Sequence, residues 1–137
     1  MFRRVLITNS NQMNENEISY GILDAAYAVH SALGPGLLES SYQAALAFEL
    51  QQAGFKVEKE KPLPLVYKEV HLEVGYRIDL LVESKVIIEI KSVEALNDIH
   101  LAQVLTYLKL SGCKLRLLLN FNVKSMKLGI KRVVNNL

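Results

Sequence analysis

The sequence of 137 residues has a single cysteine, Cys113. One cysteine excludes an intrachain disulfide and any zinc or iron–sulfur site built from four cysteines. Long apolar runs are also missing, and none approaches the ~20 residues that a membrane-spanning helix needs. The apolar part of residues 1–7 is too short for a signal peptide. We therefore expect a cytoplasmic protein with no membrane segment.

A strong charge imbalance is absent too. The formal net charge is +2, which is too small to indicate nucleic-acid binding by itself. With 50% hydrophobic and 22% charged residues, the composition is that of an ordinary globular protein. The chain contains no internal repeat, low-complexity tract or interdomain linker. We expect one domain over residues 15–137, preceded by a loosely ordered polar segment over residues 1–14.

The stretch from Gly75 to Lys91 holds two β-rich segments with a short polar break between them, which predicts a hairpin. The second segment is apolar enough to be a central strand, covered on both faces. Its side chains alternate, so that Val86, Ile88 and Ile90 lie on one face and Ile87, Glu89 and Lys91 on the other. Burying Glu89 and Lys91 costs several kcal/mol unless they are paired or hold a metal.

Asp79 lies on the first strand of this hairpin. A three-residue loop over residues 83–85 would pair Val82 with Val86 and place Asp79 opposite Glu89, with Cβ atoms roughly 4.5–5.5 Å apart. A loop of even length would send Asp79 to the other face. Two carboxylates this close repel each other, so we expect Glu89→Gln to leave the stability of the metal-free protein unchanged or to raise it. The alternative is a structural salt bridge in which Lys91 pairs with both carboxylates.

Three helices and further strands complete the prediction. In the first helix, helical spacing predicts one apolar face, formed by Ile18, Ile22, Ala25, Ala26, Val29 and Leu33. In the last helix, Leu101, Leu105 and Leu108 are expected to form the packing face. His30 is expected to be a structural histidine and His71 an exposed one. Glu39, read alone, is a first-turn carboxylate favoured by the helix dipole. The helices are expected over residues 15–33, 38–53 and 98–110, and strands over residues 56–60, 65–74 and 114–121. Residues 124–134 are expected to form a last strand with basic side chains on one side. Those side chains are either solvated or in contact with phosphate.

Asp79 together with Glu89-Ile90-Lys91 resembles the metal-binding signature of the PD-(D/E)XK nucleases, with Ile78 in place of the proline of that name. The segment 36–42 matches the motif that names the GxxExxY proteins, a small-domain family related to those nucleases. The resemblance runs from about Ile18 to Val134, and it implies an α/β fold with a mixed β-sheet flanked by α-helices. Further segments similar to this family are 34–36, 76–79, 103–107 and 120–121.

The resemblance implies a metal-dependent nuclease that hydrolyses phosphodiester bonds of nucleic acid, DNA foremost, with Mg²⁺ or Mn²⁺. It assigns catalytic roles to Glu39, Asp79, Glu89, Lys91, Gln103 and Tyr107, and metal ligation to Asp79, Glu89, the Ile90 carbonyl and Glu39. Spacing alone allows Gln103 to be a solvated glutamine and Tyr107 a half-buried tyrosine. The single cysteine excludes the iron–sulfur cluster that some QxxxY nucleases carry.

A different class of function also fits the sequence. The mild charge and the lack of an aromatic stacking ladder leave open a non-catalytic nucleic-acid-binding or regulatory domain that keeps the nuclease fold. A homodimer is left open as well. The residues do not distinguish DNA from RNA, single from double strands, or endonuclease from exonuclease action.

Overall fold

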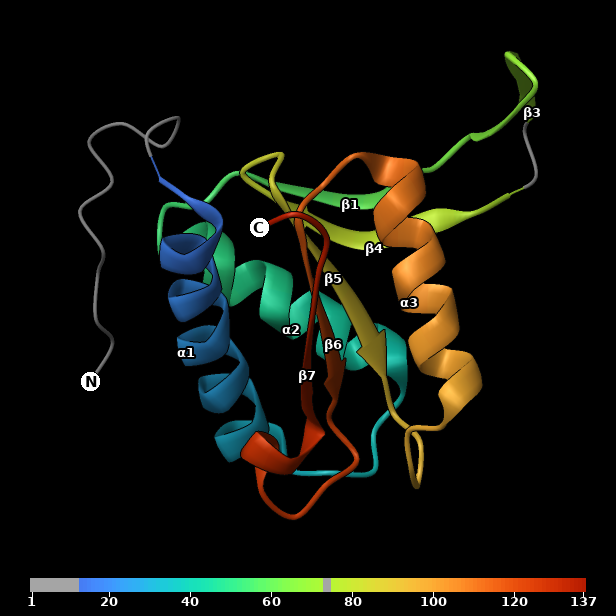
Figure 1. Ribbon diagram of the computed structural model, residues 1–137. Coiled ribbons are helices and arrows are strands. Elements are labelled where there is room, and N and C mark those ends of the chain that lie inside the picture. Colours follow the sequence, from blue (N-terminus) through green and yellow to red (C-terminus); the bar gives the residue numbers. More distant parts are fainter. Residues whose placement is uncertain (1–12, 73–74) are drawn as a thin grey trace.

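The computed structural model describes residues 13–72 and 75–137, apart from the side chains of Val104 and Tyr107. The centre of this part of the chain is a mixed five-stranded sheet in the order β1-β4-β5-β6-β7. Strands β5 and β6 are parallel, and the other neighbours are antiparallel. Helices flank the sheet (Figure 1), which confirms the predicted fold class. The strands are β1 (Val57–Pro62), β4 (Arg77–Val82), β5 (Val86–Lys91), β6 (Leu115–Asn120) and β7 (Ile130–Val134).

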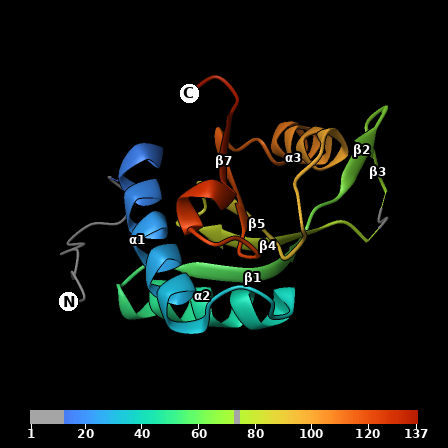
Figure 2. The ribbon, with the colours of Figure 1, turned by 90° about the horizontal axis from the view of Figure 1, so that it is seen from below.

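Two helices cover one face of the sheet, and the third lies on the other (Figure 2). The first pair is α1 (Glu15–Leu33) and α2 (Glu39–Gln52), and the third helix is α3 (Asp98–Ser111). Helix α1 begins at a capping box, because the Asn14 side chain accepts a hydrogen bond from the Glu17 amide and the Glu17 side chain accepts one from the Asn14 amide. Asn14 is therefore the ordered N-cap of α1, while residues 1–12 of the expected N-terminal segment lie outside the described residues.

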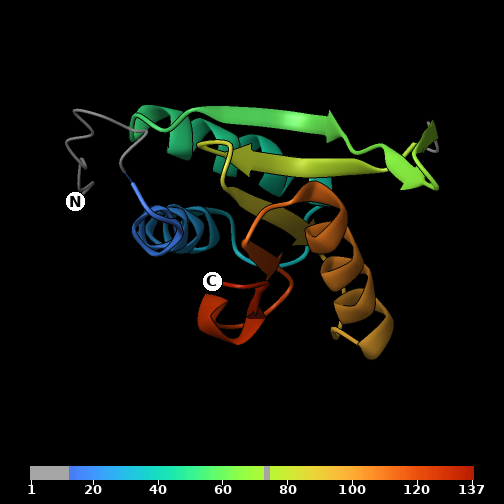
Figure 3. The same ribbon diagram turned by 45° about the horizontal axis from the view of Figure 1, so that its top comes forward.

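The main core lies between α1, α2 and the sheet. The apolar face that periodicity predicted for α1 is buried in it except for Leu33, which is 42% exposed at the end of the helix. The alternate residues of β5 that were expected to share a face are buried in the same core. The opposite face of β5 is covered as well, since Ile87 packs with Leu81 and Leu108 in a smaller cluster under α3. Figure 3 shows α1 and α3 far apart, with β5 and β6 between them. The central strand is thus covered on both faces, as predicted.

The β4–β5 hairpin has the three-residue loop that the sequence predicts. Val82 pairs with Val86, and the Lys85 amide donates a hydrogen bond to the Val82 carbonyl at 3.0 Å. Glu83 and Ser84 have φ angles of 54° and 56°, an uncommon conformation for residues other than glycine. The Glu83 carboxylate is held in place by the Lys56 amide, 2.5 Å from Oε2. An odd loop length therefore fixes the register of the two strands.

Helix α3 packs more loosely than its periodicity indicates. Leu108 is fully buried, but Leu101 and Leu105 are 36% and 39% exposed, so the expected packing face is wrong for these two residues. The apolar cluster on this side of the sheet is small, and among the residues of α3 it includes Leu108 and Leu110. Helical spacing identifies an apolar stripe, but it does not say whether a partner covers the whole stripe.

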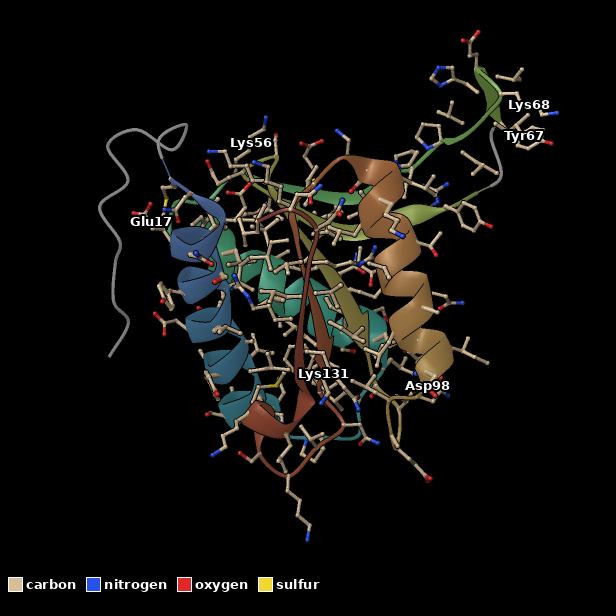
Figure 4. All side chains as sticks on the ribbon, in the orientation of Figure 1. Glu17, Lys56, Tyr67, Lys68, Asp98 and Lys131 are labelled. Carbon is tan, nitrogen blue, oxygen red and sulfur yellow. The ribbon has the colours of Figure 1, made fainter. Side chains whose placement is uncertain are left out.

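A short two-stranded hairpin, β2 (Leu65–Tyr67) and β3 (Val70–Leu72), forms a separate sheet that projects from the domain (Figure 1). Tyr67 and Lys68 lie at its tip (Figure 4). His71 on β3 is exposed, as expected, and His30 on α1 bonds the Val123 carbonyl through Nε2 at 2.7 Å. No helix in the described ranges has both the length and the apolar character that crossing a membrane requires.

The C-terminal segment differs from the expected strand with one basic side. After a short 3₁₀ helix, η2 (Met126–Gly129), strand β7 pairs Lys131 with Leu118 and Arg132 with Leu117. Because neighbouring residues on a strand point to opposite faces, the two basic side chains are separated by the sheet. Arg132 points toward α1, where it donates a hydrogen bond to Asn16 Oδ1 at 2.5 Å.

Candidate active site

Asp79 and Glu89 occupy opposed positions on β4 and β5. The pairing of the two strands ends at Leu80 and Ile88, and the same register continued by one residue sets Asp79 opposite Glu89. Leu80 and Ile88 point into the core under α1 and α2, so the two carboxylates lie on the α3 face. Oδ2 of Asp79 accepts a hydrogen bond from the Ile90 amide at 2.8 Å. The sheet thus brings the two acidic residues together as the hairpin register predicts.

The pKa of Asp79 is raised from its ordinary 3.8 to about 6. Burial is the largest cause, and the charge of Glu89 is the second. The Ile90 amide and the Lys91 ammonium lower the pKa, whereas Glu39 raises it further. No described lysine, arginine or histidine nitrogen lies within 4.0 Å of the Asp79 carboxylate. The ionised form of Asp79 is therefore poorly compensated in this structure.

Glu89 has two cationic neighbours. Arg116 on β6 donates a hydrogen bond from Nη2 to Oε2 of Glu89 at 2.5 Å, and its side chain is fully buried. The Nζ of Lys91 lies 3.9 Å from Oε1 of Glu89. The structural salt bridge considered from the sequence required Lys91 to pair with both carboxylates. Within the described part of the chain, Lys91 forms an ion pair with Glu89 and not with Asp79, and Arg116 supplies the second cation.

Sequence reasoning did not identify Arg116. The available signal is an arginine in the middle of the apolar run Leu115–Leu119, because a buried strand carries a charge only where a partner compensates it. Its partner depends on the parallel register of β5 and β6, which pairs Ile87 with Arg116 and Glu89 with Leu118. That register follows from the crossover through α3 and is not readable from local sequence.

Glu39 approaches the same end of the sheet from α2. It is the first residue of the helix, and its Oε2 accepts a hydrogen bond from the Ser92 amide at 3.2 Å. Ser92 follows Lys91 directly, and its Oγ donates to the Leu37 carbonyl at 2.7 Å. The Glu39 side chain is exposed, yet it is fixed beside the end of β5. Glu39, on α2, is thus hydrogen-bonded to the main chain directly after β5.

The main chain after Lys91 is held from two further directions. The Lys91 carbonyl accepts a hydrogen bond from the Phe121 amide at 3.0 Å. The buried side chain of Asn120 receives a hydrogen bond from the Val93 amide at 3.1 Å and donates one to the Val93 carbonyl at 3.0 Å. These contacts fix the backbone at the site, because both hydrogen-bonding groups of Val93 are held by one buried amide.

A sequence model of the PD-(D/E)XK nuclease superfamily matches residues 16–133, most of the chain. The chain belongs to this superfamily. No match was found among curated proteins or among solved structures. Superfamily membership indicates a nuclease acting on nucleic acid, and it agrees with the mixed sheet flanked by helices.

The superfamily resemblance also singled out Gln103 and Tyr107 on α3. Gln103 is exposed, and the side chain of Tyr107 lies outside the described residues. The two are four positions apart on a helix that covers the sheet face of the carboxylates, so a place beside the site remains a prediction for both.

The donor set can be compared with the divalent metal that the superfamily typically uses. Two carboxylates on adjacent strands offer the hard oxygen ligands that Mg²⁺ and Mn²⁺ prefer. In the described part of the chain, no three acidic, histidine or cysteine side chains are close enough to form a ready-made metal cage. Mg²⁺ needs no such cage, since it commonly uses one or two carboxylates with water and phosphate as its other ligands. The residues present therefore fit a divalent ion.

Proposed function

We propose that this chain is a metal-dependent nuclease that hydrolyses phosphodiester bonds, with DNA as its first expected substrate and Mg²⁺ or Mn²⁺ as its cofactor. The proposal is supported by the hairpin register, which extends to set Asp79 opposite Glu89, and by the electrostatic interaction of Asp79 with both Glu89 and Lys91. The raised pKa of Asp79 supports it, because a poorly compensated carboxylate is suited to a cation.

Asp79 and Glu89 are the proposed side-chain ligands, and the Ile90 carbonyl is the proposed backbone ligand. A bound divalent ion would supply Lewis-acid stabilisation of the charge that develops on the phosphate. Asp79 is held for this role by the Ile90 amide, which takes one of its carboxylate oxygens. Glu89 would share its carboxylate between the ion and its cationic neighbours.

Lys91 is proposed to orient the attacking water and to stabilise negative charge on it. Its backbone is fixed at the carbonyl by Phe121, and its ammonium lies on the carboxylate face. Glu39 would act from the end of α2, either through a water molecule or at a second ion. Gln103 and Tyr107 would position the scissile phosphate or the nucleophile.

Membership of the GxxExxY family is part of this proposal. Gly36, Glu39 and Tyr42 stand at the spacing of the motif, and Glu39 reaches the end of β5. Association of two copies of the chain as a homodimer is a further part of the proposal. For the assay, DNA and RNA in single- and double-stranded form are all required, because the site as described does not select among them.

A non-catalytic nucleic-acid-binding or regulatory domain is the second candidate. The observation that favours it is the pairing of Glu89 with the buried Arg116, because a carboxylate held by a guanidinium is a weaker metal ligand than a free one. Binding without cleavage would establish this reading.

A cleavage assay over that substrate panel, in Mg²⁺ and in Mn²⁺, separates the two candidates. The wild type is expected to cleave at least one substrate, and Lys91→Ala is expected to lose activity by about 100-fold or more. Lys59→Ala is the matched control, since Lys59 is an exposed lysine on edge strand β1. A wild type that binds nucleic acid but cleaves none of the panel contradicts the enzyme proposal.

A further inference from the structure

Tyr42 is the third residue of the Gly36–Glu39–Tyr42 motif, and the proposed function gives it no role. Its side chain is fully buried, whereas Glu39, three residues earlier, is exposed. The ring stacks on Phe121, with ring centres 4.6 Å apart and planes 8° from parallel. The hydroxyl donates to the Gly34 carbonyl at 2.6 Å and accepts from the Leu37 amide at 3.1 Å.

These two hydrogen bonds close the turn that leads into α2. Gly34 and Gly36 have φ angles of 69° and 96°, in the region that favours glycine, and an added Cβ at either would meet no atom within 4 Å. The glycines are therefore needed for backbone conformation and not for close packing. A turn with two glycines has wide conformational freedom, and the Leu38 N-cap supplies no side-chain hydrogen bond to limit it. The Tyr42 hydroxyl supplies that limit.

Two routes lead from Tyr42 to the end of β5. Through the turn, Tyr42 fixes Leu37, whose carbonyl accepts the Ser92 hydroxyl, and the Ser92 amide donates to Glu39. Through its ring, Tyr42 packs on Phe121, whose amide donates to the Lys91 carbonyl. The two routes meet at neighbouring residues of the proposed site. A buried tyrosine hydroxyl needs hydrogen-bond partners wherever it lies, and here both partners are main-chain groups of this one turn.

We propose that Tyr42 is a positioning residue that orients Glu39, acting through its hydroxyl, the 34–37 turn and Ser92. The inference rests on the proposed function for its catalytic consequence, but the placement of Glu39 can be measured without activity. The three residues of the motif then act together. Gly36 allows the conformation of the turn, the Tyr42 hydroxyl closes the turn, and the turn places the Glu39 carboxylate at the end of β5.

Tyr42→Phe tests the hydroxyl and keeps the stacked ring. We expect kcat to fall about tenfold, the loss typical of misplaced catalytic groups, with little change in KM. In a Glu39→Gln background the same substitution should reduce kcat further by less than about twofold, because the group it positions is already removed. Equal losses in both backgrounds would overturn the proposal, since a purely structural effect would add to that of Glu39→Gln.

Amide hydrogen exchange gives a readout that does not depend on cleavage. The Ser92 amide should exchange about tenfold faster in Tyr42→Phe, in line with the loss of a hydrogen bond. Glu39→Gln should accelerate Ser92 exchange as well. Tyr27→Phe is the matched control, because Tyr27 is a partly exposed tyrosine on α1, and it should change nothing. Unchanged Ser92 exchange in Tyr42→Phe would overturn the proposal whether or not the protein cleaves.

Ser92→Ala provides a second variant if Tyr42→Phe folds poorly. It removes the hydroxyl contact with the Leu37 carbonyl and leaves the Tyr42 core intact. We expect Ser92→Ala to lower kcat about as much as Tyr42→Phe does, and to lower it little further in the Glu39→Gln background. A wild type that cleaves no substrate would refute the proposed function, while accelerated Ser92 exchange in Tyr42→Phe would still support the positioning of Glu39. Full activity in Ser92→Ala would contradict the route through Leu37.

Discussion

The fully buried guanidinium of Arg116 donates a hydrogen bond to Glu89, 2.5 Å from Nη2 to Oε2. Because of this contact, the charges of the two carboxylates in the site are not equally compensated. Glu89 has cations beside both of its oxygens, whereas Asp79 is held by a backbone amide and carries the raised pKa. The repulsion expected between the two carboxylates is therefore concentrated on Asp79.

The first prediction concerns Glu89→Gln. From the sequence we expected this change to be neutral or stabilising in the metal-free protein, and the Arg116 contact reverses that expectation. Removing the charge leaves a buried guanidinium without its carboxylate, which should lower the free energy of unfolding by about 3 kcal/mol. Urea denaturation at neutral pH measures it.

The control is Glu58→Gln, which removes a carboxylate from an exposed pair with Lys61 and should change stability little. Equal stability of Glu89→Gln and the wild type would show that Arg116 does not depend on Glu89 for compensation.

The second prediction concerns the pH dependence of Asp79. Its pKa in the folded protein, about 6, is higher than its ordinary 3.8, so folding favours the protonated form. The resulting destabilisation is absent below about pH 4, grows as the pH rises toward 6, and is complete above it. Asp79→Asn should therefore stabilise the metal-free protein at about pH 8, by about 1–2 kcal/mol after allowance for solvent screening, and not at about pH 4.

Thermal or urea unfolding of the wild type and of Asp79→Asn at about pH 4 and about pH 8 measures this difference in stability. Asp24→Asn, at an exposed position of α1, should show no such pH-dependent gain. A gain for Asp79→Asn that is as large at low pH as at high pH would mean that charge is not its cause.

The third prediction uses two neighbouring cations of β7. Lys131 pairs with Leu118, which is also paired with Glu89, so Lys131 lies on the carboxylate face two strands from the site. Arg132 points to the other face and bonds Asn16. If nucleic acid crosses the carboxylate face, Lys131→Ala should weaken binding and reduce the slope of log Kd against log salt by about 0.7–0.9.

Arg132→Ala has the same change in charge, one residue away, and should leave that slope unchanged. Binding is measured with a Lys91→Ala background to prevent cleavage. Identical slopes for the two variants would place the nucleic acid elsewhere.

The hairpin register was predictable because it depends on a local count: a three-residue loop keeps Asp79 and Glu89 on one face. Most of the apolar face of α1 was predictable for the same reason, although Leu33 at its end is exposed. Arg116 was not, because its contact with Glu89 requires the parallel register of strands joined through α3. The exposure of Leu101 and Leu105 was missed because periodicity identifies a stripe without its partner. The role proposed for Tyr42 could not be predicted, because it depends on hydrogen bonds from its hydroxyl to the main chain of the 34–37 turn.

The most direct test of the account is whether Asp79 and Glu89 hold a divalent ion. Isothermal titration calorimetry with Mn²⁺ near pH 8 should show binding to the wild type and to Asp24→Asn. For Asp79→Asn, affinity should fall by at least about tenfold, because one of two carboxylate ligands is removed. Undiminished Mn²⁺ binding by Asp79→Asn, or no binding by the wild type, would contradict a metal centre at these carboxylates.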